Sequence, residues 1–285
     1  MEKISEGQFT KERALYNKHN LEIYNSTFFD GESPLKECSN IKIYNSIFKW
    51  KYPMWYSKDI YVSNSYLLET ARSGIWYTEN ITLENTFIEA PKQFRRSKNI
   101  KIINCNIPNA QETLWNCEDI ELYNVSAKGD YLALNSKNIK INNFHLSGNY
   151  AFDGASNIEI DNAVMLSKDS FWNCENVVVK NSTIIGEYLG WNSKNLTFIN
   201  CTIDSLQGMC YIDNIKLVNC TLLNTNLSFE LCSNIDAEII SKIDSVKNPL
   251  SGKIKAKEIG ELIQDNMNFR GNKIDNSKTI IEVEK

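Results

Sequence analysis

The sequence predicts an all-β fold, a right-handed single-stranded parallel β-helix of about eleven to twelve coils of 19–21 residues. Three observations lead to this prediction: an asparagine recurs at nearly constant spacing, a second asparagine follows it five positions later, and apolar and polar residues alternate between the two. Self-similarity at a short fixed period is typical of a solenoid, in which each coil buries its apolar faces against its neighbours.

The first asparagine column has twelve members, and aspartate replaces asparagine in two of them: Asn20, Asn40, Asp59, Asn80, Asn99, Asp119, Asn138, Asn157, Asn176, Asn195, Asn214 and Asn234. The second column runs from Asn25 to Asn219 and fails at Ile239. We expect the side-chain amides of the second column to bond to one another between coils about 4.8 Å apart, which satisfies polar groups that are costly to bury.

Each coil is predicted to have three faces. Positions one and three after the first asparagine are apolar and the position between them is mostly polar, as in Ile100, Lys101 and Ile102, which indicates a strand with one inward face. A second inward column includes Phe28 and Ile203, eight positions after the first asparagine, and a third lies five positions before the next one. Crossovers between parallel strands are overwhelmingly right-handed.

Corner positions carry residues that tolerate a left-handed backbone. They are Asn116, Asn135, Gly154, Asn173 and Asn192. A square pentapeptide-repeat solenoid is rejected because most steps are nineteen residues and the inward positions do not recur every five. Left-handed hexapeptide solenoids fail in the same way, because they need multiples of six.

The repeat predicts one continuous body with capped ends. Residues 1–19 are expected to form an N-terminal cap, residues 20–240 the β-helix, and residues 241–285 a C-terminal capping segment. A cap is expected because an uncovered strand edge would pair with other chains.

Charge and hydropathy give no sign of nucleic acid or membrane as a partner. The net charge is −4, with 31 basic and 35 acidic residues interspersed along the chain. The first residues lack the apolar run of a signal peptide, and no stretch approaches the roughly 18 apolar residues of a membrane span. We therefore expect a cytoplasmic protein, and the sequence does not indicate its oligomeric state.

Seven of the eight cysteines fall in two columns where other coils carry Ser, Thr or Ala: Cys38, Cys117, Cys174 and Cys232 in one, and Cys105, Cys201 and Cys220 in the other. We interpret these seven as small residues that fill the core, because free cysteine is commonly buried. Unpaired thiols in this number also fit a reducing compartment.

An outward aromatic strip is the most informative surface feature. The column four positions before the first asparagine contains five tryptophans, Trp55, Trp76, Trp115, Trp172 and Trp191. The same column contains Lys36, Arg95, Asp153 and Glu230, and these charged residues would not share a buried stack, so the column is expected to face outward. Beside it run Tyr131, Tyr150, Tyr188 and Lys92, with Arg96 next to Arg95. Exposed tryptophans in a row indicate a binding surface.

Aromatic rings interrupted by charges suit an oligosaccharide or uronate chain. The predicted substrate-binding residues are therefore Trp55, Trp76, Trp115, Trp172, Trp191, Tyr131, Tyr150, Tyr188, Lys92 and Arg96. Two alternatives remain open: the rings cover the outer strand, or the strip docks a protein partner on a non-catalytic scaffold.

If the protein is an enzyme, the candidate catalytic residues are Asp153, Asp169, Asp130, Glu112 and Arg95. A glycoside hydrolase needs two carboxylates about 5–10 Å apart, which adjacent coils can supply. A lyase would instead need a base near a uronate, for which Arg95 and Lys92 are candidates. Only His19 and His145 are present and no Cys/His metal spacing exists, so no cofactor is predicted, although outward carboxylates leave a Ca²⁺ site open.

The segments Lys49–Tyr56, Glu89–Arg96 and Gly186–Asn192 resemble a bacterial family of β-helix proteins of unknown function, within the pectin-lyase-like superfamily. The resemblance covers nearly the whole chain and implies a parallel β-helix. The polygalacturonase branch of that superfamily carries an Asp-Asp pair and a Gly-His-Gly motif. This sequence has neither, so the resemblance carries over no catalytic residues.

Overall fold

The computed structural model describes residues 1–283 and is a parallel β-solenoid, as predicted. The chain divides into two compact units, Met1–Ser147 and Gly148–Lys285, and each is described by itself. Together they contain about 14 turns, more than the eleven to twelve predicted. Additional coils arise because strands also form before residue 20 and after residue 240.

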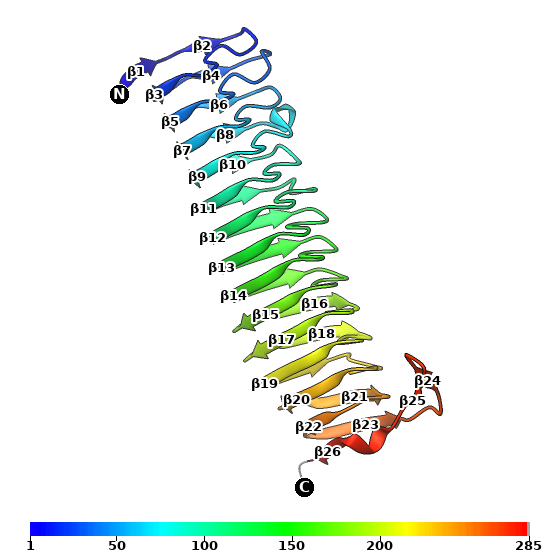
Figure 1. Cartoon of the computed structure of the whole chain (residues 1–285). Helices are drawn as coiled ribbons and strands as arrows, with labels where there is room; N and C mark the ends of the chain where they lie inside the picture. The colour runs from blue at the N-terminus through cyan, green and yellow to red at the C-terminus, as the bar shows by residue number, and fades with distance from the viewer. Residues whose placement is uncertain (284–285) are drawn as a thin grey trace. The chain divides into compact units, whose positions relative to one another are not determined.

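In the N-terminal unit, successive coils place equivalent strands side by side (Figure 1). The first-face strands are β1 (Glu2–Ser5), β3 (His19–Tyr24), β5 (Ser39–Tyr44), β7 (Lys58–Ser63), β9 (Glu79–Glu84), β11 (Lys98–Ile107), β12 (Glu118–Lys128) and β13 (Lys137–Ser147). The short second-face strands are β2 (Gln8–Phe9), β4 (Thr27–Phe28), β6 (Ile47–Phe48), β8 (Tyr66–Leu67) and β10 (Phe87–Ile88), and η1 (Glu69–Ala71) follows β8.

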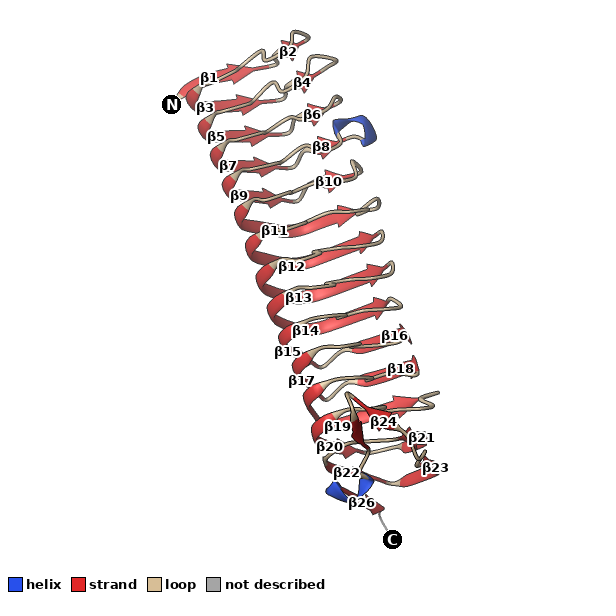
Figure 2. Ribbon diagram, turned by 45° about the vertical axis from the view of Figure 1, so that its right-hand side comes forward, coloured by secondary structure: helices blue, strands red, loops and turns tan. Residues whose placement is uncertain are grey.

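In the C-terminal unit, the first-face strands are β14 (Ser156–Leu166), β15 (Glu175–Lys180), β17 (Lys194–Ile199), β19 (Asp213–Leu223), β20 (Ser233–Ile239), β22 (Gly252–Ala256) and β26 (Thr279–Val283). The remaining elements are β16 (Thr183–Glu187), β18 (Thr202–Leu206), β21 (Lys242–Lys247), β23 (Glu258–Ile263), β24 (Asn268–Phe269), β25 (Asn272–Lys273) and η2 (Asn276–Lys278). Figure 2 shows η1 and η2 as the only helical turns of the described chain.

Strand pairing follows the repeat. His19 pairs with Ser39 and Ile23 with Ile43, one coil apart, and the pairing is parallel. Across residues 1–283 the one antiparallel pairing is the hairpin of β24 and β25. The segment predicted as an N-terminal cap contains β1 and β2, which pair with β3 and β4 and so add a coil to the ladder.

The three predicted inward columns form the core. Ile100 and Ile102 of the first face, Phe48 of the second and Phe94 of the third are at most 1% exposed. Equivalent rings stack from coil to coil, as Phe28 does on Phe48 with centroids 4.4 Å apart. All eight cysteines are buried and unpaired, which confirms the prediction for the seven assigned to small-residue columns.

Both asparagine columns form hydrogen-bonded ladders, although only the second was expected to. Asn104 Nδ2 donates to Asn85 Oδ1 (3.1 Å), and in the first column Asn99 Nδ2 donates to Asn80 Oδ1 (2.7 Å). These side chains are exposed, so the expectation that the ladder serves buried amides was wrong. The ladder residues have φ near +50°, a conformation that asparagine tolerates better than most residues, and this explains their place at the corners.

Corner backbone conformation is also left-handed where predicted, at Asn116, Asn135, Gly154, Asn173 and Asn192. Bulky residues such as Phe94 (φ 55°) and Leu114 (φ 62°) also adopt the left-handed conformation, which their intrinsic backbone preference does not predict. A left-handed residue costs roughly 1–2 kcal/mol. Full burial of these two apolar side chains contributes about 1.5–3 kcal/mol each and offsets that cost.

Candidate functional site

In the N-terminal unit the aromatic strip is a stack along the coils. The indole rings of Trp55 and Trp76 lie 5.2 Å apart at an interplanar angle of 8°. The Arg95 guanidinium follows, 4.7 Å from the Trp76 ring and 4.6 Å from the Trp115 ring. Parallel β-bridges from Trp76 to Arg95 and from Arg95 to Trp115 hold these residues in register. The ring faces are therefore occupied by neighbouring members of the strip.

The indole N–H groups are also used within the protein. Trp55 Nε1 donates to the Ser73 carbonyl (2.6 Å), and Trp115 Nε1 donates to the Tyr131 carbonyl (2.7 Å). Trp76 Nε1 donates to the Lys92 backbone carbonyl (3.0 Å). Each bond ties an indole to the next coil, so these tryptophans lie outside the core but are half-buried, in contrast to the exposed rings that were predicted.

The charged residues of this part of the strip neutralise one another. Glu112 Oε2 accepts from Arg95 Nη2 (3.3 Å) and lies 3.2 Å from Lys92 Nζ. Arg95 is thus held by two rings and a carboxylate, and Arg96 beside it points to solvent. The Glu112 carboxylate is therefore already engaged by two cations within the protein.

In the C-terminal unit the strip is less regular. The rings of Trp172 and Trp191 are tilted by 37° with centroids 5.9 Å apart. Tyr150 meets Trp172 edge-on, and Tyr188 meets Trp191 edge-on. Trp172 Nε1 donates to the Tyr188 carbonyl (2.7 Å). Tyr150 and Tyr188 therefore support the indoles as side neighbours.

The candidate catalytic aspartates have separate partners. Asp153 Oδ1 accepts from Asn173 Nδ2 (2.9 Å). Asp169 is 8% exposed, and its pKa is raised, chiefly by burial and next by the Glu187 carboxylate. A raised carboxyl pKa suits a general acid. Asp130, in the N-terminal unit, is half-buried, and its backbone N–H donates to Gln111 Oε1 (3.3 Å).

A solvent-facing cavity of about 320 Å³ lies at the carboxyl ends of β6, β8 and β10. It is lined by Trp50, Lys51, Glu69, Thr70, Arg72 and Pro91. The Thr70 hydroxyl donates to the Lys49 carbonyl and fixes η1 against the turn after β6. None of these six residues was among the site residues predicted from the sequence.

Trp50 differs from the tryptophans of the strip. Within residues 1–283 its indole N–H has no acceptor and its ring has no aromatic neighbour, and the Lys51 ammonium lies 5.4 Å from the ring centroid. Lys51 Nζ is 2.6 Å from Glu32 Oε1. The side chains of Arg72 and Glu69 have no hydrogen-bond or ion-pair partner in the described chain, so they are available to a ligand.

Two signals in the sequence mark this cavity. The step from Asp59 to Asn80 is 21 residues, the longest of the repeat, and the extra residues form the η1 bulge. Trp50 stands nine positions before Asp59, where other coils carry small residues such as Gly31, Ala90 or Gly129. A large aromatic residue in a column of small ones could have identified the site.

Residues 2–281 match a family described as protein of unknown function (DUF3737). The chain belongs to the DUF3737 family. The match covers almost the full length, and it agrees with the β-helix family of unknown function that the sequence resembles. No curated protein matches the sequence.

Solved structures similar to this DUF3737 chain include a tailspike protein mutant of E. coli bacteriophage HK620 in complex with a pentasaccharide. It has 9% identity and a TM-score of 0.41, covering 98% of this chain and 70% of that one. The Azotobacter vinelandii mannuronan C-5 epimerase AlgE6 A-module has 10% identity and a TM-score of 0.33, and the match covers 99% of this chain and 91% of that one. A Thermotoga maritima exopolygalacturonase has 11% identity and a TM-score of 0.30, covering 98% and 83%.

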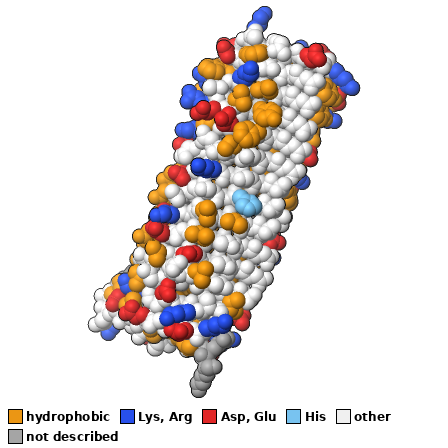
Figure 3. Space-filling view, turned by 180° about the vertical axis from the view of Figure 1, so that it is seen from behind, with side chains coloured by type: hydrophobic (Ala, Val, Ile, Leu, Met, Phe, Trp, Pro, Cys, Tyr) orange, Lys and Arg blue, Asp and Glu red, His pale blue; other side chains and the backbone are white. Residues whose placement is uncertain are grey.

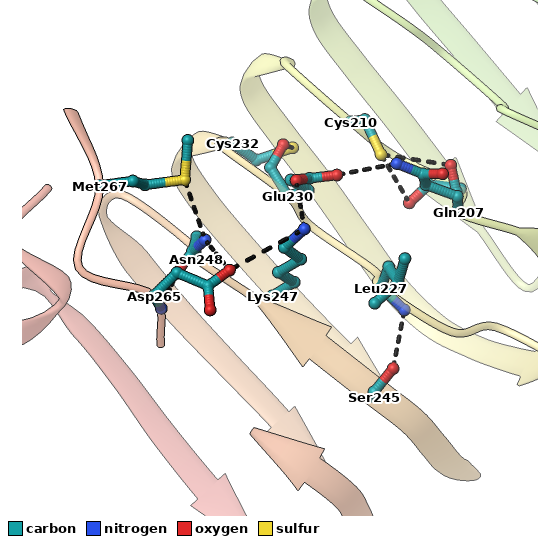
Figure 4. Close-up of polar contacts among 11 residues, drawn as sticks. Gln207, Cys210, Leu227, Glu230, Cys232, Ser245, Lys247, Asn248, Asp265 and Met267 are labelled. Atoms are coloured by element: carbon teal, nitrogen blue, oxygen red, sulfur yellow. Dashed lines mark hydrogen bonds and ion pairs between the residues drawn. The ribbon is translucent and has the colours of Figure 1, made fainter. Parts of the chain in front are cut away.

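A second polar cluster of the DUF3737 chain lies near its C-terminus (Figure 4). The Glu230 carboxylate, 6% exposed, accepts from Gln207 Nε2 (2.9 Å) and lies 3.0 Å from Lys247 Nζ. Asn248 exchanges two hydrogen bonds with Asp265, through Asp265 N to Asn248 Oδ1 (2.8 Å) and Asn248 Nδ2 to Asp265 Oδ2 (3.3 Å). The cluster fastens the segment that leads from β23 to the β24–β25 hairpin.

The described residues hold no group of three or more His, Cys, Asp or Glu side chains placed to bind a metal ion. No helix within residues 1–283 is long and apolar enough to cross a membrane. On the face drawn in Figure 3, acidic and basic side chains are intermixed.

Proposed function

We propose that this DUF3737 protein binds a saccharide without cleaving it, at the cavity around Trp50. The observation that carries the proposal is a set of side chains that line one cavity of about 320 Å³. Within residues 1–283, the Trp50 indole packs against no other ring and the side chains of Arg72 and Glu69 are unpaired. Saccharide sites pair an aromatic surface with a few polar groups that fix orientation. Trp50 and Pro91 supply apolar surface, Arg72 donates to hydroxyl or carboxylate oxygens, and Glu69 accepts from hydroxyl groups.

The cavity replaces the aromatic strip as the proposed binding surface. A pyranose needs a free ring face, and Trp76 already has the Trp55 ring and the Arg95 guanidinium beside it. The strip is for the same reason not proposed as a docking surface for a partner. Catalysis is left out of the proposal because none of the five candidate catalytic residues, Asp169 included, lines the cavity. In addition, Glu112 and Arg95 are engaged with each other and Asp153 with Asn173.

The test is a binding screen with matched tryptophan variants. Glucose, N-acetylglucosamine and galacturonic acid, each as a series of one to four units, are titrated into the full chain by calorimetry. We expect one series to bind, Trp50→Phe to weaken it at least about tenfold, and Trp172→Phe, in the strip, to leave it unchanged. Each variant is checked by its melting temperature.

Two results would overturn the proposal. One is the absence of any heat or melting-temperature shift with all three series. The other is loss of binding in Trp172→Phe with binding retained in Trp50→Phe, which would return the site to the strip. Slow appearance of shortened products during the titration would instead contradict the non-catalytic part.

A further inference from the structure

An apolar row crosses the outer side of the second face next to the cavity. Ile47 pairs with Tyr66 and Tyr66 with Phe87, in parallel register on β6, β8 and β10. Ile47 and Phe87 are half-buried, whereas their strand neighbours Phe48 and Ile88 are in the core. The row becomes polar at Asn106, which pairs with Phe87 on the next coil. Figure 3 shows hydrophobic side chains gathered with charged ones around them in its upper part.

Tyr66 is the most exposed tyrosine of the described chain, at 51%. Tyr56 is 50% exposed but stacks on Tyr77 at 4.7 Å and 3°, and the Tyr16 hydroxyl donates to Glu37 (2.7 Å). Tyr66, by contrast, has no hydrogen-bond partner for its hydroxyl within residues 1–283. Its one ring contact is Phe87, tilted by 48° at 6.2 Å. About half of the Tyr66 surface is therefore exposed, whereas the tryptophans of the strip are half-buried.

The row is continuous with the cavity. Leu68, which directly follows β8, is also extended, so Tyr66 and Leu68 project to the same side because side chains alternate along extended chain. The next residue, Glu69, lines the cavity. Three residues of extended chain span about 10 Å, which leaves space for further sugar rings beyond one held at Trp50. Leu68 is half-buried and does not block this path.

We propose that Tyr66, flanked by Phe87 and Ile47, is a second subsite, so that the ligand is an oligosaccharide that lies from the Trp50 cavity along the outer side of β8. This inference rests on the proposed function and adds the length and direction of the ligand. A terminal ring occupies the cavity, where Arg72 and Glu69 orient it, and the following ring packs on the exposed surface of Tyr66. Aromatic surface with a polar hydroxyl at its edge suits the alternating apolar and polar sides of a pyranose.

Chain-length dependence tests this subsite. The series of glucose, N-acetylglucosamine or galacturonic acid oligomers that binds the full chain is titrated into Tyr66→Ala and into Tyr123→Ala. Tyr123 lies on β12 and is 36% exposed, so it controls for loss of an exposed tyrosine. We expect the wild-type affinity to rise from one unit to three, and Tyr66→Ala to weaken the trimer about tenfold while leaving the monomer unchanged. Tyr123→Ala should leave both unchanged.

The possible failures are separate. Equal affinity for monomer and trimer, or equal weakening of both by Tyr66→Ala, would overturn the second subsite and leave the Trp50 cavity as the binding site. Loss of all lengths in Trp50→Phe, with loss only of the longer ones in Tyr66→Ala, would support both proposals. Absence of binding by every series would overturn both.

Discussion

The indole rings of Trp55 and Trp76 stack face to face, 5.2 Å apart and 8° from parallel, although the residues are 21 positions apart in the sequence. The stack continues through Arg95 to Trp115. Such aromatic and cation–π contacts are worth roughly 0.5–2 kcal/mol each. The column therefore stabilises the outer side of the coils.

We expect Arg95→Met to lower the free energy of unfolding by about 1–3 kcal/mol, because it removes two cation–π contacts and the ion pair with Glu112. Arg95→Lys should recover only part of the loss, since an ammonium lacks the planar guanidinium face. Urea unfolding measures both variants. The neighbouring exposed Arg96→Met is the control, and an equal effect of Arg96→Met would contradict the structural role of the stack.

The asparagine ladder gives a second stability prediction. Asn104→Ala removes hydrogen bonds to Asn85 and Asn124 and places alanine at φ 51°. We expect a loss of about 1–3 kcal/mol. Asn104→Gly keeps the backbone conformation accessible and should cost less. The exposed strand residue Asn106 provides the control variant Asn106→Ala, which should change stability by at most about 0.5 kcal/mol, and thermal unfolding ranks the three.

The buried thiols predict a loss of stability in alkali. Burial raises the pKa of Cys105 to about 11 and that of Cys117 to about 12, from an ordinary value of 9.0. The folded state therefore keeps protons that the unfolded state releases, so the stabilisation is complete below about pH 9 and is lost as the pH rises toward the folded values.

At about pH 10 each such thiol should cost on the order of 1 kcal/mol relative to about pH 8. Urea unfolding at the two pH values measures the difference. Cys117→Ser removes one buried thiol and should reduce the difference in unfolding free energy between the two pH values by about 1 kcal/mol. Serine fits this position, because Ser136 occupies the same column in the next coil. An unchanged difference in Cys117→Ser would show that this thiol is not the source.

The C-terminal cluster predicts a coupled pair. Lys247→Met leaves the Glu230 carboxylate buried without its cation, and we expect a loss of about 3–5 kcal/mol. The double variant Glu230→Gln with Lys247→Met should recover much of it. Limited proteolysis around Asp265 reports local opening. Additive losses in the double variant would contradict the pairing.

The columns of the fold could be predicted because each residue of a coil meets its equivalent in the next. The inward positions, the corner asparagines and the small-residue columns of Cys117 and Ser136 all follow from spacing alone. The number of coils was underestimated because strands such as β1 and β22 lack the asparagine pattern, yet β1 pairs in parallel with β3 and β22 with β20.

The functional surface could be predicted only in part. Spacing places Trp55 and Trp76 outside the core, but it does not show that their rings turn flat against each other and donate to the next coil. The cavity was missed because it arises where one coil departs from the repeat, at η1. The repeat therefore predicts the core, whereas the candidate site lies in the one coil that is lengthened by η1.

The ladder hydrogen bonds join residues only 19 to 21 positions apart, as between Asn99 and Asn80 or Asn80 and Asp59. A coil therefore depends on its two neighbours and on little else. Duplication or loss of one whole coil would still present matching corners and matching apolar layers at the junction. Such a protein can change length in evolution by unit steps, while a single coil with inserted residues, such as the one that carries Arg72, acquires a new surface without cost to the others.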